Sequence, residues 1–354
     1  MLGLLLARAD LVPRRRRVGD RVMRRSWISA MVVVAVTALP GVPAVATATE
    51  PGERVLLAAG DIAKCDSPGD EATAALVTNE LADPTASVAM LGDGAYPDGD
   101  LAHYQSCYDP SWGQFKDRTR PSTGNHEYAN AATRQAQGYF DYWGAAAGPR
   151  PQGYYSYDLG AWHVAVLNST CGNQGGNGVG GCNAKDPMGR WLASDLAASP
   201  TPCKLVYFHH PRFYSMSVEP GVSVKPGQGA SSDAKLDSIW ALLQQAGVDV
   251  ALSGHHHTYE RFPRMKASGG KPGTGTPDPG GVRQFVAGTG GGEQESFVAD
   301  MIDPNSERRI EHNFGVLKLT LRTNGYDWSF LSAGTPGTAE PPAGTVLDAG
   351  HDGC

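Results

Sequence analysis

The chain has 354 residues, of which 41% are hydrophobic, and its formal net charge is −6. This length and composition allow one large α/β domain or two smaller ones, each with a full core. The 45 glycines and 25 prolines indicate many loops between the elements. The acidic balance makes nucleic acid a poor candidate for a docking partner.

The first 48 residues have the pattern of a bacterial-type export signal. Arginines at 14–17, 21, 24 and 25 precede the apolar run 27–39, and small residues at 44–48 offer a cleavage site. Arg24-Arg25 approximates a twin-arginine signal, and an ordinary secretory signal also fits. We expect residues 1–48 to be removed, with Met1 or Met23 as the true start. The secreted, extracellular product would keep 22 basic and 34 acidic residues, a net charge of −12, and no membrane segment.

All six cysteines follow the expected cleavage point. An even number of cysteines in an exported chain predicts disulfides, and six cysteines allow 15 connectivities. A zinc site of cysteines is not favoured, because the sequence contains no C-x-x-C spacing. Among these connectivities, the pairing that we prefer is a guess: Cys171 with Cys182 around a Gly-rich loop, Cys65 with Cys107 and Cys203 with Cys354.

Four apolar runs have the signature of buried strands that end at polar side chains. They end at Asp61 (run 54–63), at Asp93 (run 87–96), at His209 (run 204–213) and at His255, His256 and His257 (run 248–257). Because α/β sheets bind ligands at the carboxyl ends of their strands, we expect these side chains to lie together. In extended backbone, His255 and His257 would point to one side and His256 to the other.

Helices and hairpins are expected between and beyond these strands. The pattern predicts helical segments over about 70–81, 101–118, 131–143, 186–196 and 233–246, and loops over 214–231 and 265–281. A hairpin over 153–169 indicates a second sheet, and a hairpin over 314–333 around Asn324-Gly325 is expected to extend that same sheet. We therefore expect a catalytic domain over 51–333. A Gly/Pro-rich tail over 334–354 would be loose unless Cys354 ties it down.

The strand ends and one further loop supply a set of metal donors. The loop is Gly124-Asn125-His126-Glu127, in which the amide oxygen of Asn125 can complete a ligand shell. Each donor taken alone also fits a turn, a helix cap or a surface histidine. These donors are Asp61, Asp93, Asn125, His209, His255 and His257. Three imidazoles, two carboxylates and an amide are too many for one tetrahedral ion and suit two ions that share a carboxylate. Such ions, about 3.5–4 Å apart, support in-line displacement at phosphorus.

Five short blocks, in this order, resemble the metallophosphoesterases of the calcineurin-like fold. They are G-D-I-A (60–63), G-D-G-A-Y (92–96), G-N-H-E (124–127), V-Y-F-H (206–209) and G-H-H-H (254–257). Ala63 stands where many members have a histidine, and Tyr96 stands where the purple acid phosphatase branch has a tyrosine. The resemblance implies a four-layer α/β/β/α sandwich in which helices flank two mixed sheets.

The resemblance also implies the roles of individual residues. It assigns one metal to Asp61, Asp93, Tyr96 and His257 and the second to Asp93, Asn125, His209 and His255, with Asp93 bridging. Phenolate suits Fe(III) at the Tyr96 position, and Fe(II), Zn or Mn would occupy the other. His126 is the implied general acid that protonates the departing alkoxide. His210, Arg212 and His256 are candidates for substrate contact, although packing or solvent exposure explains them equally well.

We therefore expect a secreted binuclear phosphatase that hydrolyses phosphate monoesters by in-line attack of a metal-bound hydroxide. Its partner would be a small-molecule phosphate ester, and the oligomeric state stays open. One alternative is a phosphodiesterase or nucleotidase on the same scaffold, selected by loops 97–118, 171–182 and 214–231. Another is a non-catalytic secreted protein that binds metal or glycan.

Overall fold

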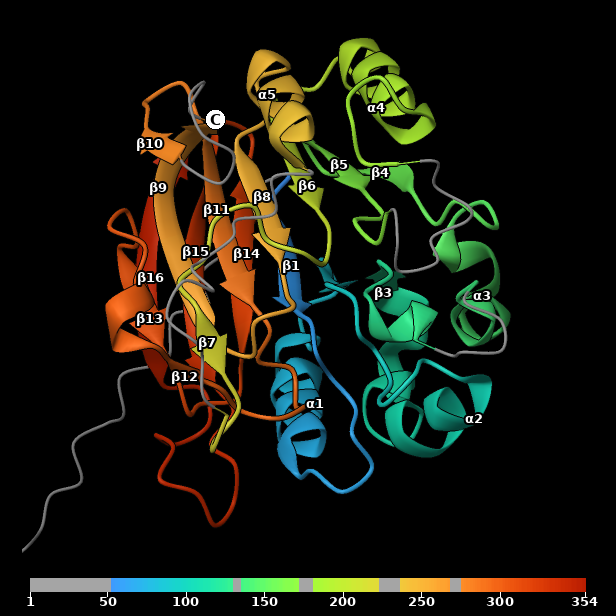
Figure 1. The fold of residues 1–354 in the computed structure, drawn as a ribbon, viewed down its shortest axis with the longest axis vertical. Coiled ribbons are helices and arrows are strands. Elements are labelled where there is room, and N and C mark those ends of the chain that lie inside the picture. Colours follow the sequence, from blue (N-terminus) through green and yellow to red (C-terminus); the bar gives the residue numbers. More distant parts are fainter. Residues whose placement is uncertain (1–51, 130–134, 172–180, 223–235, 268–274) are drawn as a thin grey trace, which may run out of the picture. The chain divides into compact units, whose positions relative to one another are not determined.

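The structure is a computed structural model that describes residues 52–129, 135–171, 181–222, 236–267 and 275–354 (Figure 1). The expected export signal over 1–48 lies outside the described residues. None of the helices found in the described ranges has the length and apolar character needed to cross a membrane.

The first sheet is built around β1 (Arg54–Ala59) and β2 (Ala86–Met90), the first two predicted strands. They pair in parallel, with Val55 opposite Ala86, and α1 (Gly69–Glu80) connects them. Layers cover both faces of this sheet, which explains the unbroken apolar run of β1. In the described part of the chain the strand order is β16-β15-β14-β1-β2-β3, where the further strands are β3 (Thr119–Pro121), β14 (Gly315–Arg322), β15 (Gly325–Ser332) and β16 (Val346–Gly353).

The second sheet has a parallel centre and antiparallel edges. Its parallel strands are β5 (Trp162–Val166), β6 (Cys203–Tyr207), β8 (Val250–Ser253) and β11 (Val282–Ala287). Antiparallel partners are β4 (Tyr155–Leu159), β9 (Tyr259–Ala267), β10 (Gly275–Pro277) and β13 (Arg308–Ile310). The short strands β7 (Ser217–Val218) and β12 (Ser296–Phe297) pair with each other. Both main sheets are therefore mixed, as predicted.

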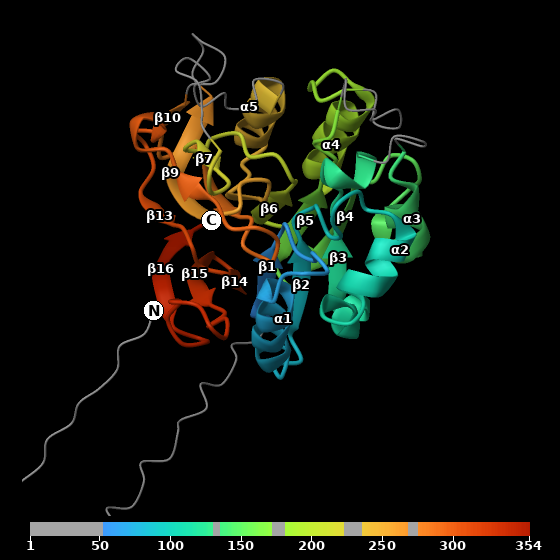
Figure 2. The same ribbon diagram turned by 60° about the horizontal axis from the view of Figure 1, so that its bottom comes forward.

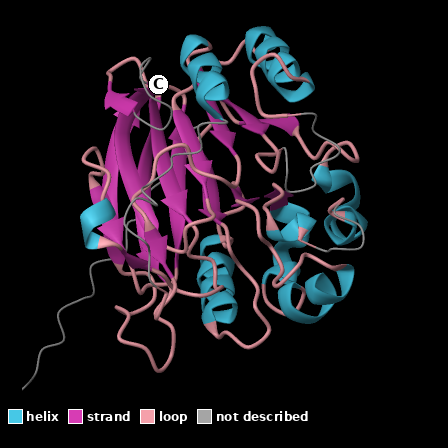
Figure 3. Cartoon of the chain, viewed as in Figure 1, coloured by secondary structure: helices cyan, strands magenta, loops and turns pink. Residues whose placement is uncertain are grey.

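Helices lie on the outer faces of the two sheets, so that the chain forms four layers (Figures 2 and 3). Three buried apolar clusters lie between these layers. Leu57 of β1 packs toward α1, α2 (Leu101–His103) and α3 (Gln137–Trp143) on the outer face of the first sheet. Its neighbour Leu56 packs between the two sheets, because successive strand residues face opposite sides. Trp240 of α5 (Asp237–Gln245) packs on the outer face of the second sheet together with α4 (Pro187–Ala198). The predicted four-layer α/β/β/α sandwich is confirmed.

Two expectations about strands are wrong. The 314–333 hairpin, β14 and β15, belongs to the first sheet and not to the sheet of the 153–169 hairpin, because β14 pairs antiparallel with β1. The expected 265–281 loop is shorter, because β9 extends to Ala267 and β10 begins at Gly275. Parts of the expected 131–143 helix, the 171–182 and 214–231 loops and the start of the 233–246 helix lie outside the described residues.

The C-terminal residues form a strand that the sequence interpretation did not predict. β16 pairs with β15, and its carboxylates Asp348 and Asp352 accept hydrogen bonds from Arg261 (2.7 Å) and Arg264 (2.9 Å) of β9 in the second sheet. All three suggested disulfides are present: Cys65–Cys107, Cys171–Cys182 and Cys203–Cys354. The last of these joins the start of β6 to the residue after β16.

Candidate metal centre

Two Gly-Asp turns lie side by side at the carboxyl ends of β1 and β2. Pairing continues past the strands, because Ile62 N donates to Asp93 O (3.0 Å) and Ala63 N donates to Gly94 O (3.0 Å). Asp61 and Asp93 have φ of 59° and 49°, in the left-handed region that residues other than glycine rarely adopt. Such strained backbone is typical of functional sites. The turns bring both carboxylates, each buried, to one edge of the sheet.

Asp61, Tyr96 and His257 form one group of donors, which we name the Tyr96 group. The Tyr96 hydroxyl donates to Asp61 Oδ1 at 3.0 Å and lies 3.0 Å from His257 Nε2, which is 3.3 Å from Asp61 Oδ1. His257 Nδ1 donates to the carbonyl oxygen of Glu293 at 2.7 Å. A carbonyl can only accept a hydrogen bond, so Nδ1 of His257 carries a proton and Nε2 is the ring atom that faces the group and can bind a cation once it loses its own proton.

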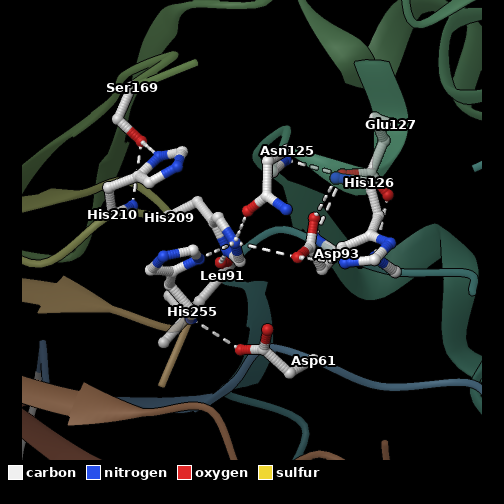
Figure 4. Close-up of polar contacts among 12 residues, drawn as sticks. Asp61, Leu91, Asp93, Asn125, His126, Glu127, Ser169, His209, His210 and His255 are labelled. Atoms are coloured by element: carbon white, nitrogen blue, oxygen red, sulfur yellow. Dashed lines mark hydrogen bonds and ion pairs between the residues drawn. The ribbon is translucent and has the colours of Figure 1, made fainter. Parts of the chain in front are cut away.

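Asp93, Asn125, His209 and His255 form the second group, the His209 group (Figure 4). His209 Nε2 lies 2.9 Å from Asp93 Oδ2, 2.9 Å from Asn125 Oδ1 and 3.3 Å from His255 Nδ1. His209 Nδ1 donates to Leu91 O at 2.9 Å, which turns Nε2 toward the other donors. Donor atoms of Asp93, His209 and His255 all lie within 4.8 Å of one another, a spacing that fits a bound cation.

Hydrogen bonds from backbone N–H groups to carboxylates join the loops that carry the two groups. His255 N donates to Asp61 Oδ2 and His126 N donates to Asp93 Oδ1, each at 2.8 Å. The loops approach so closely that a Cβ at Gly124 would lie 2.1 Å from Asp93 Oδ1, which explains the glycine of G-N-H-E. The structure thus brings together all seven predicted ligands, and their carboxylate, phenol, amide and imidazole donors fit two cations. The bridging role of Asp93 stays a prediction.

The three consecutive histidines do not lie in extended backbone, contrary to the prediction. β8 ends at Ser253, and His255 has φ of 72°. His255 and His257 nevertheless line the same cavity. His256 turns away, with its ring 4.2 Å from that of Tyr214 and its Nδ1 2.9 Å from Ser217 Oγ. A tight turn, and not the pleat of a strand, separates the histidines.

Charge and burial set the protonation of the donors when no cation is present. Burial lowers the pKa of His209, but Asp93 and Asp61 outweigh it and raise that pKa to about 9. Burial also lowers the pKa of His257, but its hydrogen bond with Asp61 outweighs burial and raises that pKa to about 9. Burial and the neighbouring imidazoles hold the pKa of His255 well below its ordinary value. Burial and the two aspartates raise the pKa of Tyr96, so its ionisation needs a strongly Lewis-acidic cation.

A cavity of about 560 Å³ opens over the donors. Five predicted ligands line it, and so does His126, whose ring centroid lies 4.5 Å from that of Tyr96. His126 Nδ1 donates to Pro97 O at 2.5 Å, and Nε2 lies 4.0 Å from Asp93 Oδ2. This position at the edge of the donors is compatible with the predicted general acid, and that role of His126 stays a prediction.

The three candidates for substrate contact are not among the described residues that line this cavity. His210 Nδ1 lies 2.9 Å from Ser169 Oγ, and its ring packs 4.5 Å from that of His255. Arg212 is fully buried and pairs with Asp237 of α5 at 2.5 Å. These placements, and that of His256, favour packing roles for all three side chains.

The sequence interpretation gave no role to several other residues around the cavity. Lys64 and Glu293 form an ion pair in its wall, and Glu295 accepts a hydrogen bond from His257 N at 3.0 Å. Glu127 is buried behind the donors, and burial together with Asp93 raises its pKa. Its place in the G-N-H-E block was the signal that could have identified it, and the glycine turn 290–292 was the signal for Glu293 and Glu295.

Comparisons with known proteins agree with this geometry. Residues 55–259 match the family described as calcineurin-like phosphoesterase. The chain is 29% identical to purple acid phosphatase 21 of Arabidopsis thaliana over 46% of this chain and 37% of that protein. It is 27% identical to purple acid phosphatase 22 over 61% of this chain and 48% of that protein, so it spans less than half of each relative. Its fold is similar to purple acid phosphatase PPD1 from yellow lupin (TM-score 0.62, 20% identity, 85% of this chain and 54% of that chain).

Proposed function

The chain belongs to the calcineurin-like phosphoesterase family, and on this basis we propose that it hydrolyses phosphate monoesters at a binuclear metal centre. The observation that carries the proposal is the convergence of seven donors, from five separate segments, beside one cavity. A structural role alone does not explain why two buried carboxylates and three imidazoles meet in strained turns at the ends of neighbouring strands.

The donor set supports one cation in the Tyr96 group and one in the His209 group, with Asp93 shared between them. Hard anionic oxygens favour Fe(III) in the Tyr96 group, and the imidazoles and amide of the His209 group suit Fe(II), Zn or Mn. When bound, such ions lower the pKa of water and offset charge on phosphoryl oxygens.

The chain itself supplies orientation and a proton. The carbonyl oxygens of Leu91 and Glu293 hold the imidazoles of His209 and His257 in place by their Nδ1 atoms. His126, held by Pro97 O, is placed to donate a proton from Nε2 to the oxygen of the leaving group. This step requires the leaving group to lie on the His126 side of the cavity.

We also propose that the protein is exported and acts outside the cell. The support is the arginine and apolar pattern over 1–48 together with three disulfides, which persist in oxidising compartments. Fusion of residues 1–48 to a reporter enzyme tests this part separately, because retention of the reporter inside the cell would contradict it.

Phosphate release from p-nitrophenyl phosphate and from its bis-ester tests the proposed reaction. We expect metal-dependent turnover that a chelator abolishes and added metal restores, with the monoester cleaved faster. Asp93→Asn is the matched inactive control. Faster cleavage of the diester would favour the phosphodiesterase alternative. No metal-dependent release on either ester from acid to alkaline pH would leave only the binding role.

A further inference from the structure

Glu127 lies directly behind the candidate centre and is not among the described residues that line the cavity. Its side chain is 2% exposed, and it follows Asn125 and His126 in the G-N-H-E block. We propose that Glu127 is a positioning residue that fixes Asp93 and Asn125 relative to each other. The inference rests on the proposed function, since it concerns the same centre.

Both carboxylate oxygens of Glu127 are fully engaged. Oε2 accepts from Asp93 N at 3.0 Å and from Gly124 N at 2.6 Å. Oε1 accepts from Gly94 N at 2.9 Å and from the Tyr104 hydroxyl at 2.9 Å. Three of these four donors are backbone N–H groups of the two loops that carry Asp93 and Asn125.

The hydrogen bonds between these two loops run in both directions, and we call this set of bonds the clamp. Glu127 binds the backbone of the Asp93 turn, and the Asp93 carboxylate in turn accepts from the backbone N–H of His126 at 2.8 Å. Asp93 also needs this support because its φ of 49° is strained, and strained backbone persists only where its surroundings hold it. Loss of Glu127 would let the turn relax and move the Asp93 carboxylate away from Asn125 and His209.

Only a carboxylate of this length satisfies the four donors. A glutamine has one acceptor oxygen, and its NH₂ group would face two N–H or O–H donors in place of the second oxygen. Glu127→Gln is therefore nearly equal in size to the native side chain but cannot accept all three backbone bonds, because the Tyr104 hydroxyl can turn to accept from the NH₂ group whereas a backbone N–H cannot. Tyr104→Phe is the matched control, because it removes one hydrogen bond from Oε1 and leaves the three backbone bonds.

The experiment measures metal dissociation constants by chelator competition and, on p-nitrophenyl phosphate, kcat and KM separately. For Glu127→Gln we expect metal affinity and kcat to fall by about 10–100-fold, the range seen when residues that orient metal ligands are lost. KM should change little, because Glu127 does not line the cavity. Tyr104→Phe should lower both metal affinity and kcat by much less.

A purely structural role would lower the unfolding temperature of Glu127→Gln and leave metal affinity and kcat of the folded fraction unchanged, which would overturn the proposal. If Glu127→Gln does not fold, Glu127→Asp carries the test. It keeps two acceptor oxygens on a shorter side chain, so weaker metal binding than in Tyr104→Phe supports the clamp, and wild-type binding refutes it. Metal binding is read without substrate, so an inactive wild-type protein would contradict the proposed function alone.

Discussion

The Tyr96 group and the His209 group lie at the same strand ends but differ in chemistry and in anchoring. The Tyr96 group combines a carboxylate, a phenol and one imidazole. Its imidazole donates a hydrogen bond to the carbonyl oxygen of Glu293, which follows the glycine turn after β11. The His209 group combines a carboxylate, an amide and two imidazoles, and His209 is fully buried against the end of β2.

This difference indicates that the two cation positions are unequal in kind. Anionic oxygen donors select a hard, highly charged cation, whereas imidazole and amide donors suit a borderline divalent one. We therefore expect the side chains of the centre to discriminate between metals. Substitutions that remove one donor should separate the two positions, and a substitution at Asp93 should not.

Asp93→Asn should have the largest effect. The substitution removes the carboxylate that lies 2.9 Å from His209 and that both predicted ligand sets share. We expect both ions to be lost and kcat/KM to fall by at least about 10³-fold, because each ion contributes several kcal/mol to catalysis. Metal analysis and phosphate release measure this, and Asp61→Asn is the comparison, since it should empty the Tyr96 position first. Two ions per chain in Asp93→Asn would contradict the shared role.

His126→Gln should spare both metal positions and slow only the chemistry. The substitution keeps a polar side chain of similar reach but removes the proton donor, so kcat on alkyl phosphates should fall by about 10²-fold. The loss should be much smaller with p-nitrophenyl phosphate, because p-nitrophenolate leaves without a proton. Equal losses on both ester types would exclude the general-acid role, and a changed metal content would mean that His126 acts on the centre itself.

Tyr96→Phe should separate the two groups. It removes the phenol that contacts Asp61 and His257 and leaves every donor of the His209 group in place. We expect loss of any violet tyrosinate-to-iron absorption, weaker binding of one of the two ions and a fall in kcat of about 10-fold, the lower end of the range for altered metal surroundings. An absorption band that survives the substitution would show that Tyr96 is not the coloured ligand.

The sequence was informative where chemistry repeats along the chain. Buried apolar runs that end in Gly-Asp or histidine located the donors, because the end of a strand is a local property. The residues near β14 do not indicate which sheet it joins, because its partner β1 lies far away in the sequence, with Leu321 opposite Arg54. The hydrogen bonds of Glu127 could not be predicted for the same reason, because their donors include backbone N–H groups of another loop. β16 was missed because its polar residues are held mainly by Arg261 and Arg264 of β9.

His163 offers a control outside the centre and the smallest expected effect. It lies on β5, nearly buried, with Nδ1 2.8 Å from Asp158 Oδ1 and Nε2 2.8 Å from Asp195 Oδ2. Burial lowers its pKa, but the two carboxylates outweigh burial and raise it. The imidazolium therefore stabilises the fold fully below its unfolded pKa of about 6.5, and this contribution is lost as pH rises through the higher folded pKa.

His163→Gln should lower the free energy of unfolding by about 1–3 kcal/mol at pH 5, as expected when hydrogen bonds between charged groups are lost, and by less at pH 9. Urea unfolding at the two pH values measures the difference. His209 is also held by carboxylates, but its contribution should depend on bound metal, whereas a chelator should leave the His163→Gln difference unchanged. If the loss of unfolding free energy in His163→Gln were larger at pH 9 than at pH 5, the prediction would be wrong. Such a result would mean that the two aspartates favour neutral His163.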